Sequence, residues 1–149
     1  MKNNIAIPVF LVLVLVMALI GCKDKKEDDP NLNENEKVNQ LLTSAGLWSV
    51  QSVTVDGSDQ ISLYKDVKLS FTTSTYNSLN GGVIWPASGT WKFADDSGKS
   101  IVRDNTLPMT INEIAEKKLV LSFTWSKTTL GSGRATSIAG QHIFIFTKP

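Results

Sequence analysis

From residue 46 to the end of the chain, apolar and polar residues alternate in short runs that turn residues separate. A period of two is typical of a β-strand that buries one face, so this alternation constrains the fold more than any other feature. The clearest run covers residues 67–72, where Val67, Leu69 and Phe71 would face inward. Further strands are expected at residues 47–55, 76–85, 89–93, 100–103, 107–111, 119–125 and 142–147.

Turn residues lie between these runs. Residues 56–57, Asp-Gly, are typical of a two-residue hairpin turn. Asn-Gly-Gly at 80–82 interrupts a strand that would resume at residues 83–85 and stop at Pro86. Further turns are expected at residues 95–98, 112–117 and 131–133. About eight short strands at regular spacing favour an all-β domain, an antiparallel up-and-down barrel or half-barrel.

One short helix is expected before the strands. Val38, Leu41 and Leu42 are spaced like one face of a helix over residues 36–44, and Gly46 would end it. The residues just before it are almost wholly polar, and such a segment cannot offset the entropy of ordering. We therefore expect a disordered tether at residues 22–35 and a single domain at residues 36–149, because a chain of this length builds one core.

The N-terminal residues have the parts of a secretory signal peptide. Lys2 supplies the positive start, and an uncharged, mostly apolar run extends from Ile5 to Ile20. This run is shorter than the ~20 residues that a membrane-spanning helix needs. We therefore expect residues 1–21 to be a signal peptide, with an uncleaved membrane helix as the alternative.

Residues 18–22, Ala-Leu-Ile-Gly-Cys, resemble the lipobox of bacterial lipoproteins, in which a small residue precedes an obligatory cysteine. The resemblance implies cleavage between Gly21 and Cys22, a diacylglyceryl group on the Cys22 sulfur and usually an acyl chain such as palmitate on its new amine. Two or three acyl chains hold a protein firmly on a membrane, whereas one chain holds it marginally. Cys22 is therefore the expected membrane anchor, unless it is incidental to an ordinary signal peptide.

The tether also resembles an export tag. Some Gram-negative bacteria use a basic residue and an acidic cluster after the lipidated cysteine to send lipoproteins to the outer face of the outer membrane. Lys23 and the acidic residues that follow it would form this tag; the acidic members are Asp24, Glu27, Asp28 and Asp29. A generic solvated linker has a similar composition. We expect the outer membrane, and the sequence leaves open the periplasmic or the cell-surface face.

Charge and cysteine content exclude several kinds of partner. The chain has 15 basic and 14 acidic residues, and loss of Lys2 with the signal peptide would make the two numbers equal. This balance gives no reason to expect nucleic acid as a partner. Cys22 is the only cysteine, so a lipidated chain has no thiol for disulfides or metal binding.

Gly46-Leu47-Trp48, at the start of the first expected strand, matches the G-x-W signature of lipocalins. Residues 36–148 also resemble the small lipocalin-like lipoproteins of Gram-negative bacteria, in which a helix precedes a Trp-bearing strand and an aromatic strand is followed by Lys. The resemblance implies an eight-stranded up-and-down barrel. It also implies an Arg packed over the signature Trp, for which Arg134 is the candidate.

Candidate catalytic groups are few. His142 is the only histidine, which excludes a zinc site built on several histidines, and we expect it to be a half-exposed structural residue. Paired carboxylates could act as acid and base, but the acidic residues lie where turns are expected, and solvated turns explain them better. These residues are Asp56, Asp59, Asp95, Asp96, Glu113 and Glu116. We expect no enzyme activity, no metal site and no cofactor apart from the covalent lipid on Cys22.

The tryptophans are the candidates for ligand contact. Trp48, Trp91 and Trp125 share the parity of the inward-facing residues, and aromatic walls could stack on a sugar or an apolar ligand. An eight-stranded barrel is either packed solid or holds one small ligand, and we expect a largely filled interior with any pocket small and at one mouth. The first hypothesis is a membrane-anchored module that binds a small apolar or saccharide-like ligand, through Trp48, Trp91, Trp125 and Arg134. The alternative is a structural or protein-interaction lipoprotein, including an inhibitor, with an envelope protein as partner and no small ligand.

Overall fold

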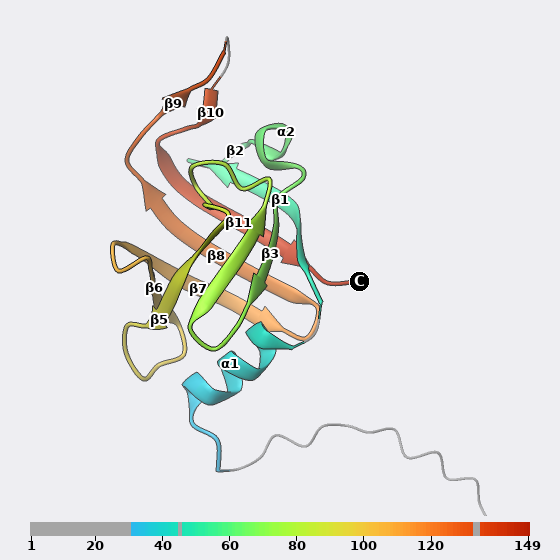
Figure 1. Cartoon of the computed structure of the whole chain (residues 1–149), viewed down its shortest axis with the longest axis vertical. Coiled ribbons are helices and arrows are strands. Elements are labelled where there is room, and N and C mark those ends of the chain that lie inside the picture. Colours follow the sequence, from blue (N-terminus) through green and yellow to red (C-terminus); the bar gives the residue numbers. More distant parts are fainter. Residues whose placement is uncertain (1–30, 45, 133–134) are drawn as a thin grey trace, which may run out of the picture.

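The computed structural model describes residues 31–44, 46–132 and 135–149. Within them, eight antiparallel strands form a closed barrel (Figure 1), in which each strand pairs with its neighbours along the chain and the last pairs with the first. The strands are β1 (Trp48–Val55), β3 (Lys68–Phe71), β4 (Thr75–Leu79), β5 (Ser88–Phe93), β6 (Ser100–Arg103), β7 (Leu107–Ala115), β8 (Lys118–Trp125) and β11 (Gly140–Thr147). The predicted all-β, up-and-down, lipocalin-like barrel is confirmed, and it is closed rather than a half-barrel.

The registers put the apolar residues of each strand on the inside. Between β8 and β11, Leu121 pairs with Phe144 and Leu119 pairs with Phe146. On the other side of β11, Phe144 pairs with Val53 of β1, which closes the barrel. Closure removes free strand edges, which otherwise invite pairing with other chains.

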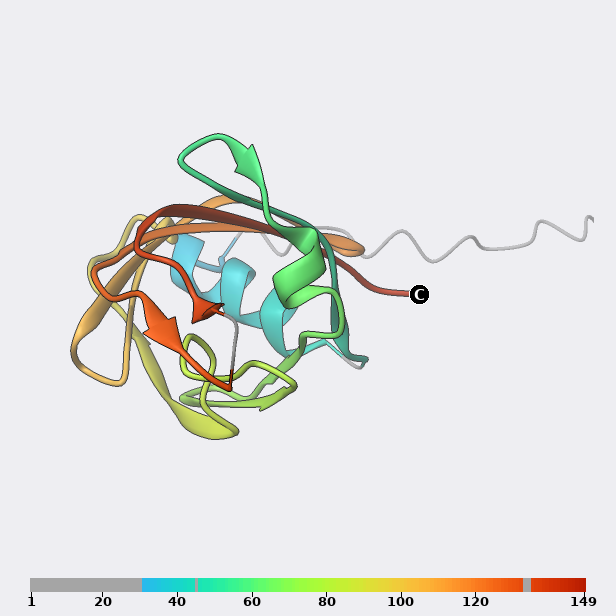
Figure 2. The same cartoon turned by 90° about the horizontal axis from the view of Figure 1, so that it is seen from above.

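The lower end of the barrel in Figure 1 is covered by helix α1 (Glu34–Thr43). The helix begins two residues before its predicted start, because the Asn33 side chain accepts a hydrogen bond from Glu36 N and the Glu36 carboxylate accepts one from Asn33 N. Val38 and Leu42 are buried against the strands. The Asn35 side chain bonds the β5–β6 turn at the carbonyl of Asp95 and the N–H of Gly98. Figure 2 shows the helix lying across the barrel end.

The upper end carries elements that the sequence did not predict. A short strand β2 (Ser58–Asp59) follows the predicted Asp56-Gly57 turn, whose φ values of 48° and 80° are those of a tight hairpin turn. Helix α2 (Ile61–Tyr64) comes next. The hairpin of β9 (Thr129–Leu130) and β10 (Ala135–Ser137) projects beyond the barrel (Figure 1).

Two strand boundaries differ from the prediction. Residues 83–85 do not resume strand β4 but belong to a loop, residues 80–87, that turns into the barrel. The turn predicted at residues 112–117 is wrong, because β7 continues to Ala115 through a bulge between Ile111 and Glu113. A bulge adds one residue to a strand and disturbs its alternation, which is the signal that was used to end the strand.

Candidate functional site

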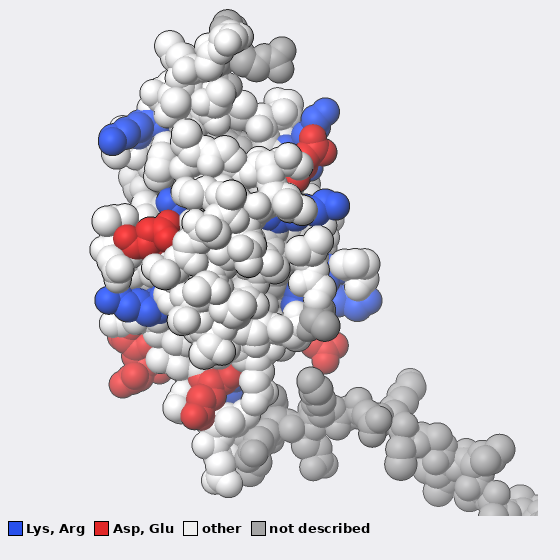
Figure 3. Space-filling model, viewed as in Figure 1, with Lys and Arg blue, Asp and Glu red and all other residues white. Residues whose placement is uncertain are grey.

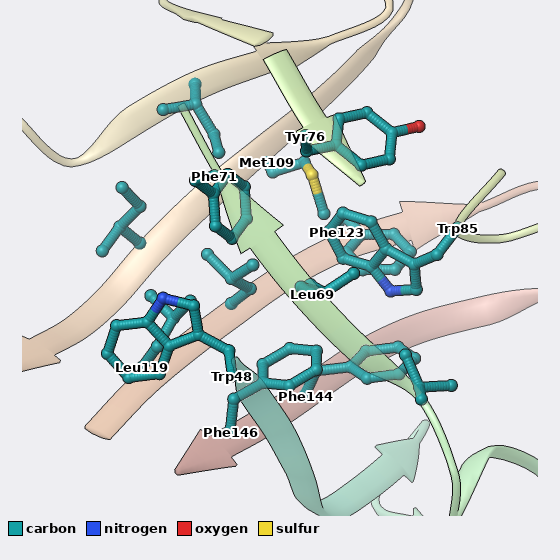
Figure 4. Packing of buried hydrophobic residues seen from close by; sticks show 14 of the residues in the cluster. Trp48, Leu69, Phe71, Tyr76, Trp85, Met109, Leu119, Phe123, Phe144 and Phe146 are labelled. Atoms are coloured by element: carbon teal, nitrogen blue, oxygen red, sulfur yellow. The ribbon is translucent and has the colours of Figure 1, made fainter. Parts of the chain in front are cut away.

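The interior of the barrel is the first candidate, and side chains fill it. Trp48, Tyr76, Trp85, Phe144 and Phe146 are all fully buried (Figure 4). Trp85, only 1% exposed, meets the rings of Tyr76, Phe123, Phe144 and Phe146 edge to face, at centroid separations of 5.8 to 6.4 Å. Such contacts are favourable, and they surround the indole with the side chains of the barrel. The prediction of a largely filled interior is confirmed.

Trp85 reaches the interior because the loop of residues 80–87 is fixed by its own hydrogen bonds. The backbone N–H of Trp85 donates to the carbonyl of Gly81 at 3.0 Å. Ser78 Oγ donates to the carbonyls of Trp85 and Pro86 at 2.6 and 2.9 Å. Gly81 is required, since a Cβ there would overlap Trp85. The sequence signal that ended strand β4, the Asn-Gly-Gly turn, therefore also begins this inward loop.

Arg103 lies under the same loop and is only 5% exposed. Its Nη1 donates to the carbonyl of Ile84, and its Nε donates to Asp104 Oδ2 at 3.0 Å. The guanidinium carbon lies 5.2 Å from the ring centre of Trp85 and 6.0 Å from those of Tyr76 and Trp125, the range of cation–π contacts. Arg103 thus fastens the loop to the barrel wall.

Asp104 collects three donors around this cation. Besides Arg103, it accepts bonds from the hydroxyl of Tyr76 and the backbone N–H of Thr90, each at 2.9 Å. Burial and the bond to Asp104 raise the pKa of Tyr76 to about 12, so this phenol stays protonated and donates at neutral pH. The arrangement neutralises a buried charge and leaves no reactive group free.

Two buried indole N–H groups lack a hydrogen-bond acceptor in the described part of the chain. Among the described residues, the Nε1 atoms of Trp85 and Trp125 are buried and have no hydrogen-bond partner. Both rings face Arg103. The buried donors of the upper end are therefore less completely hydrogen-bonded than those of the rest of the described barrel.

The lower end holds a different cation. Lys148 Nζ lies 3.9 Å above the ring centre of Trp48 and donates to Ser44 O and Ser44 Oγ at 2.9 and 2.7 Å. The Trp48 indole in turn donates to the carbonyl of Leu42 at 3.2 Å. Burial lowers the pKa of Lys148. Lys148, which follows the last strand in the sequence, therefore packs over the signature tryptophan, and the predicted candidate Arg134 lies outside the described residues.

His142 is fully buried, so the prediction of a half-exposed residue is wrong. Its ring stacks on Phe123 at 5.3 Å with an interplanar angle of 3°. Its nitrogens meet the hydroxyl of Tyr64 at 3.3 Å and the carbonyl of Gly140 at 3.1 Å. Helix α2, absent from the prediction, is what covers it. Burial lowers its pKa from the ordinary 6.5.

The predicted ligand-contacting tryptophans have different partners. Trp48 packs under Lys148 at the lower end, while Trp91 packs between Phe71 and Phe93 and donates to the carbonyl of Thr72. Trp125 faces Arg103 at the upper end. They therefore do not form one aromatic wall. Gly21 and Cys22, the predicted cleavage and lipidation residues, lie outside the described residues, as does Arg134.

The candidate carboxylates act singly. Asp95 accepts from Ser97 N at 2.9 Å, and the hydrogen bonds from Ser97 lower its pKa. Glu113, in strand β7 rather than a turn, pairs with Lys118 at 2.7 Å on the surface. Asp59 bonds the N–H of Ile61 and Asp56 bonds that of Gln141. No group of three or more His, Cys, Asp or Glu side chains that could hold a metal occurs in the described part of the chain.

Two of the hollows in the structure are lined by described residues, and the lining of the second includes the core residues Ile101, Met109 and Phe123. One, of about 420 Å³, is lined by the first residues of α1 and by Phe93. The other, of about 370 Å³, lies over β6, β7, β8 and β11. Its polar lining residues are Asp95, Ser100, Thr110, Ser122, Thr124 and Gln141.

Comparison of the chain with protein-family models and with curated proteins finds no match. Of the helices in residues 31–149 that are described, none has the length and apolar character needed to cross a membrane. A function for this chain is therefore argued from its fold and from the contacts described above.

Proposed function

We propose that the protein is a cell-envelope lipoprotein, anchored in the outer membrane by lipid on Cys22, and that its barrel is a non-catalytic protein-interaction module. The filled interior carries the second part of this proposal. Trp85 and the aromatic rings around it occupy the interior that a carried ligand would need, so the interaction hypothesis is favoured over the ligand-carrier hypothesis.

The position of α1 indicates which end would meet a partner. The described chain begins at residue 31 below α1, so a lipid anchor upstream of it would tether the lower end (Figure 1). The upper end carries exposed apolar side chains, Leu79 at 55% and Leu130 at 76%. Charged side chains gather toward the edges of the face in Figure 3 and leave its middle uncharged. Such a surface suits a neutral protein partner and gives no reason to expect nucleic acid.

A second candidate keeps a small ligand but moves it outside the barrel. The hollow over β6, β7, β8 and β11 is lined by hydroxyl and amide groups that could bond a saccharide-like ligand. In this hypothesis the tryptophans have no contact with the ligand.

Two experiments test the main proposal. Cys22→Ser should abolish lipidation and also cleavage before residue 22, because the cysteine is obligatory in a lipobox, so the variant should keep its apolar N-terminal segment and carry no lipid; a variant that is correctly trimmed and still membrane-bound would refute the anchor. For the interaction module, a photo-crosslinking residue at Leu79 or Leu130 should link to one envelope protein in intact cells, whereas the same residue at Lys92, on the barrel wall, should not. Equal labelling at all three positions would refute a partner at the upper end.

A further inference from the structure

Two segments that are distant in the sequence meet at the only histidine. His142 lies in β11 and Tyr64 in α2, and Ile138, between β10 and β11, lies four positions before the histidine. The Gly140 carbonyl can only accept, so His142 Nδ1 carries the proton and Nε2 accepts from the Tyr64 hydroxyl. The backbone of Ile138 also acts on the Tyr64 hydroxyl, where it opposes the rise in the pKa of Tyr64 that burial causes. The hydrogen bonds therefore run in one direction, from Tyr64 through a neutral His142 to the carbonyl of Gly140.

The surroundings of the ring favour that neutral form. Phe123 and Phe144 stack on His142 at 5.3 and 6.0 Å, and Tyr64 meets it edge to face. The charged group that acts on it is Asp56, in the β1–β2 turn, whose carboxylate is already bonded to Gln141 N at 2.8 Å. From α2 the titratable group is Tyr64, and β8 contributes the apolar Phe123. A single carboxylate with another partner offsets only part of the cost of burying an imidazolium.

Protonation would reverse one hydrogen bond of the chain. An imidazolium donates from both nitrogens, so Nε2–H would point at a hydroxyl whose own hydrogen now occupies that space. Tyr64 would then accept from His142 and leave its own hydrogen without an acceptor in a buried place. The simplest relief is for α2 and the base of the β9–β10 hairpin to move away and expose the ring to water.

We propose that His142 is an acid-sensitive latch: its protonation releases α2 and the β9–β10 hairpin from the upper end, while the lower end stays closed. The lower end contains no histidine, and histidine is the side chain whose charge ordinarily changes between pH 5 and 8. The latch would couple the shape of the proposed interaction end to the acidity of its surroundings.

Hydrogen exchange measured by mass spectrometry on the full-length lipidated protein tests the latch. With a free-histidine pKa of 6.5, the opening equilibrium at pH 5 should rise over that at pH 7.5, by at most about 30-fold. After correction for the intrinsic pH dependence of exchange, faster exchange is expected in residues 60–66 and 126–132 and not in residues 34–43. Faster exchange at both ends, or at neither, would overturn the proposal.

Two variants separate the latch from general acid sensitivity. His142→Gln keeps a polar side chain without a titration and should abolish the difference between the two pH values. Tyr64→Phe keeps the ring but removes the hydroxyl whose hydrogen bond must reverse, so His142 should titrate at higher pH while the acid-induced rise in exchange becomes smaller. Because the chain has one histidine, its NMR titration can be followed directly in the wild type and in Tyr64→Phe. A His142 titration that leaves exchange at the upper end unchanged would also overturn the proposal, even if His142→Gln failed to fold.

Discussion

The two ends of the barrel are closed by different means. The lower end is sealed by a capped helix of 10 residues and by Lys148, which bonds the C-terminal carbonyl groups of that helix and packs on Trp48. The upper end is closed by a four-residue helix, an inward loop and a neutral histidine. We infer from this comparison that the lower end stays closed, whereas the upper end can open when His142 is protonated. The variants below test the stability of each end.

The largest effect is expected from Trp85→Ala, which removes the centre of the packed interior. Truncation of a buried Trp typically costs about 3–5 kcal/mol, because the remaining side chains cannot fill the cavity. Urea unfolding measures this loss of free energy of unfolding. Trp85→Phe, which keeps an aromatic ring, should cost clearly less. A loss below about 1 kcal/mol for the Ala variant would mean that Trp85 does not fill the barrel.

At the lower end, Lys148→Met should destabilise the protein by about 1–2 kcal/mol, from loss of the cation–π contact and of hydrogen bonds to Ser44. The same measurement on Lys117→Met, an exposed lysine in the nearby β7–β8 turn, should show almost no change. Equal effects for both variants would contradict the role given to Lys148.

The third prediction concerns pH. The folded state lowers the pKa of His142, so the unfolded chain takes up a proton at higher pH than the folded chain. The stability from neutral His142 is therefore complete above pH 6.5 and falls as the pH drops below it, by at most about 1.4 kcal/mol per pH unit. Urea midpoints between pH 8 and 5 should show this slope in the wild type. His142→Gln should remove it, and a slope that persists in this variant would assign it to other groups.

The smallest effect is expected for the surface pair of Glu113 and Lys118. Both side chains are about half exposed, and exposed ion pairs contribute little because water and salt screen them. Glu113→Gln should change the free energy of unfolding by less than about 0.5 kcal/mol. A larger loss would contradict this prediction and would show that the ion pair at the bulged end of β7 contributes substantially to stability.

The sequence predicted the barrel because its strands follow a simple alternation of buried and exposed residues. The inward sets Val67, Leu69 and Phe71, and Leu119, Leu121 and Phe123, are buried as expected. Boundaries were wrong where that rule fails, at the bulge in β7 and at residues 83–85. Within residues 83–85, Trp85 is buried although it lies in a loop, and burial from a loop leaves no periodic pattern in the sequence.

The candidate site was less predictable than the fold. Trp125 and Trp48 lie on the inner face as expected, but the contacts that give them a role come from Arg103 and Lys148. Lys148 lies 100 positions from Trp48, and its contact follows from closing β11 on β1. His142 was misjudged because its cover, α2, is too short to give a helical pattern.

The central claim is a filled barrel carried on a lipid anchor, and native mass spectrometry of the protein gently extracted from its own membrane tests it most directly. The account predicts a chain that begins at Cys22 and carries a diacylglyceryl group and an acyl chain on that residue, with no further molecule bound. One additional small molecule retained per chain, lost when the protein unfolds, or an unmodified Cys22 would contradict it.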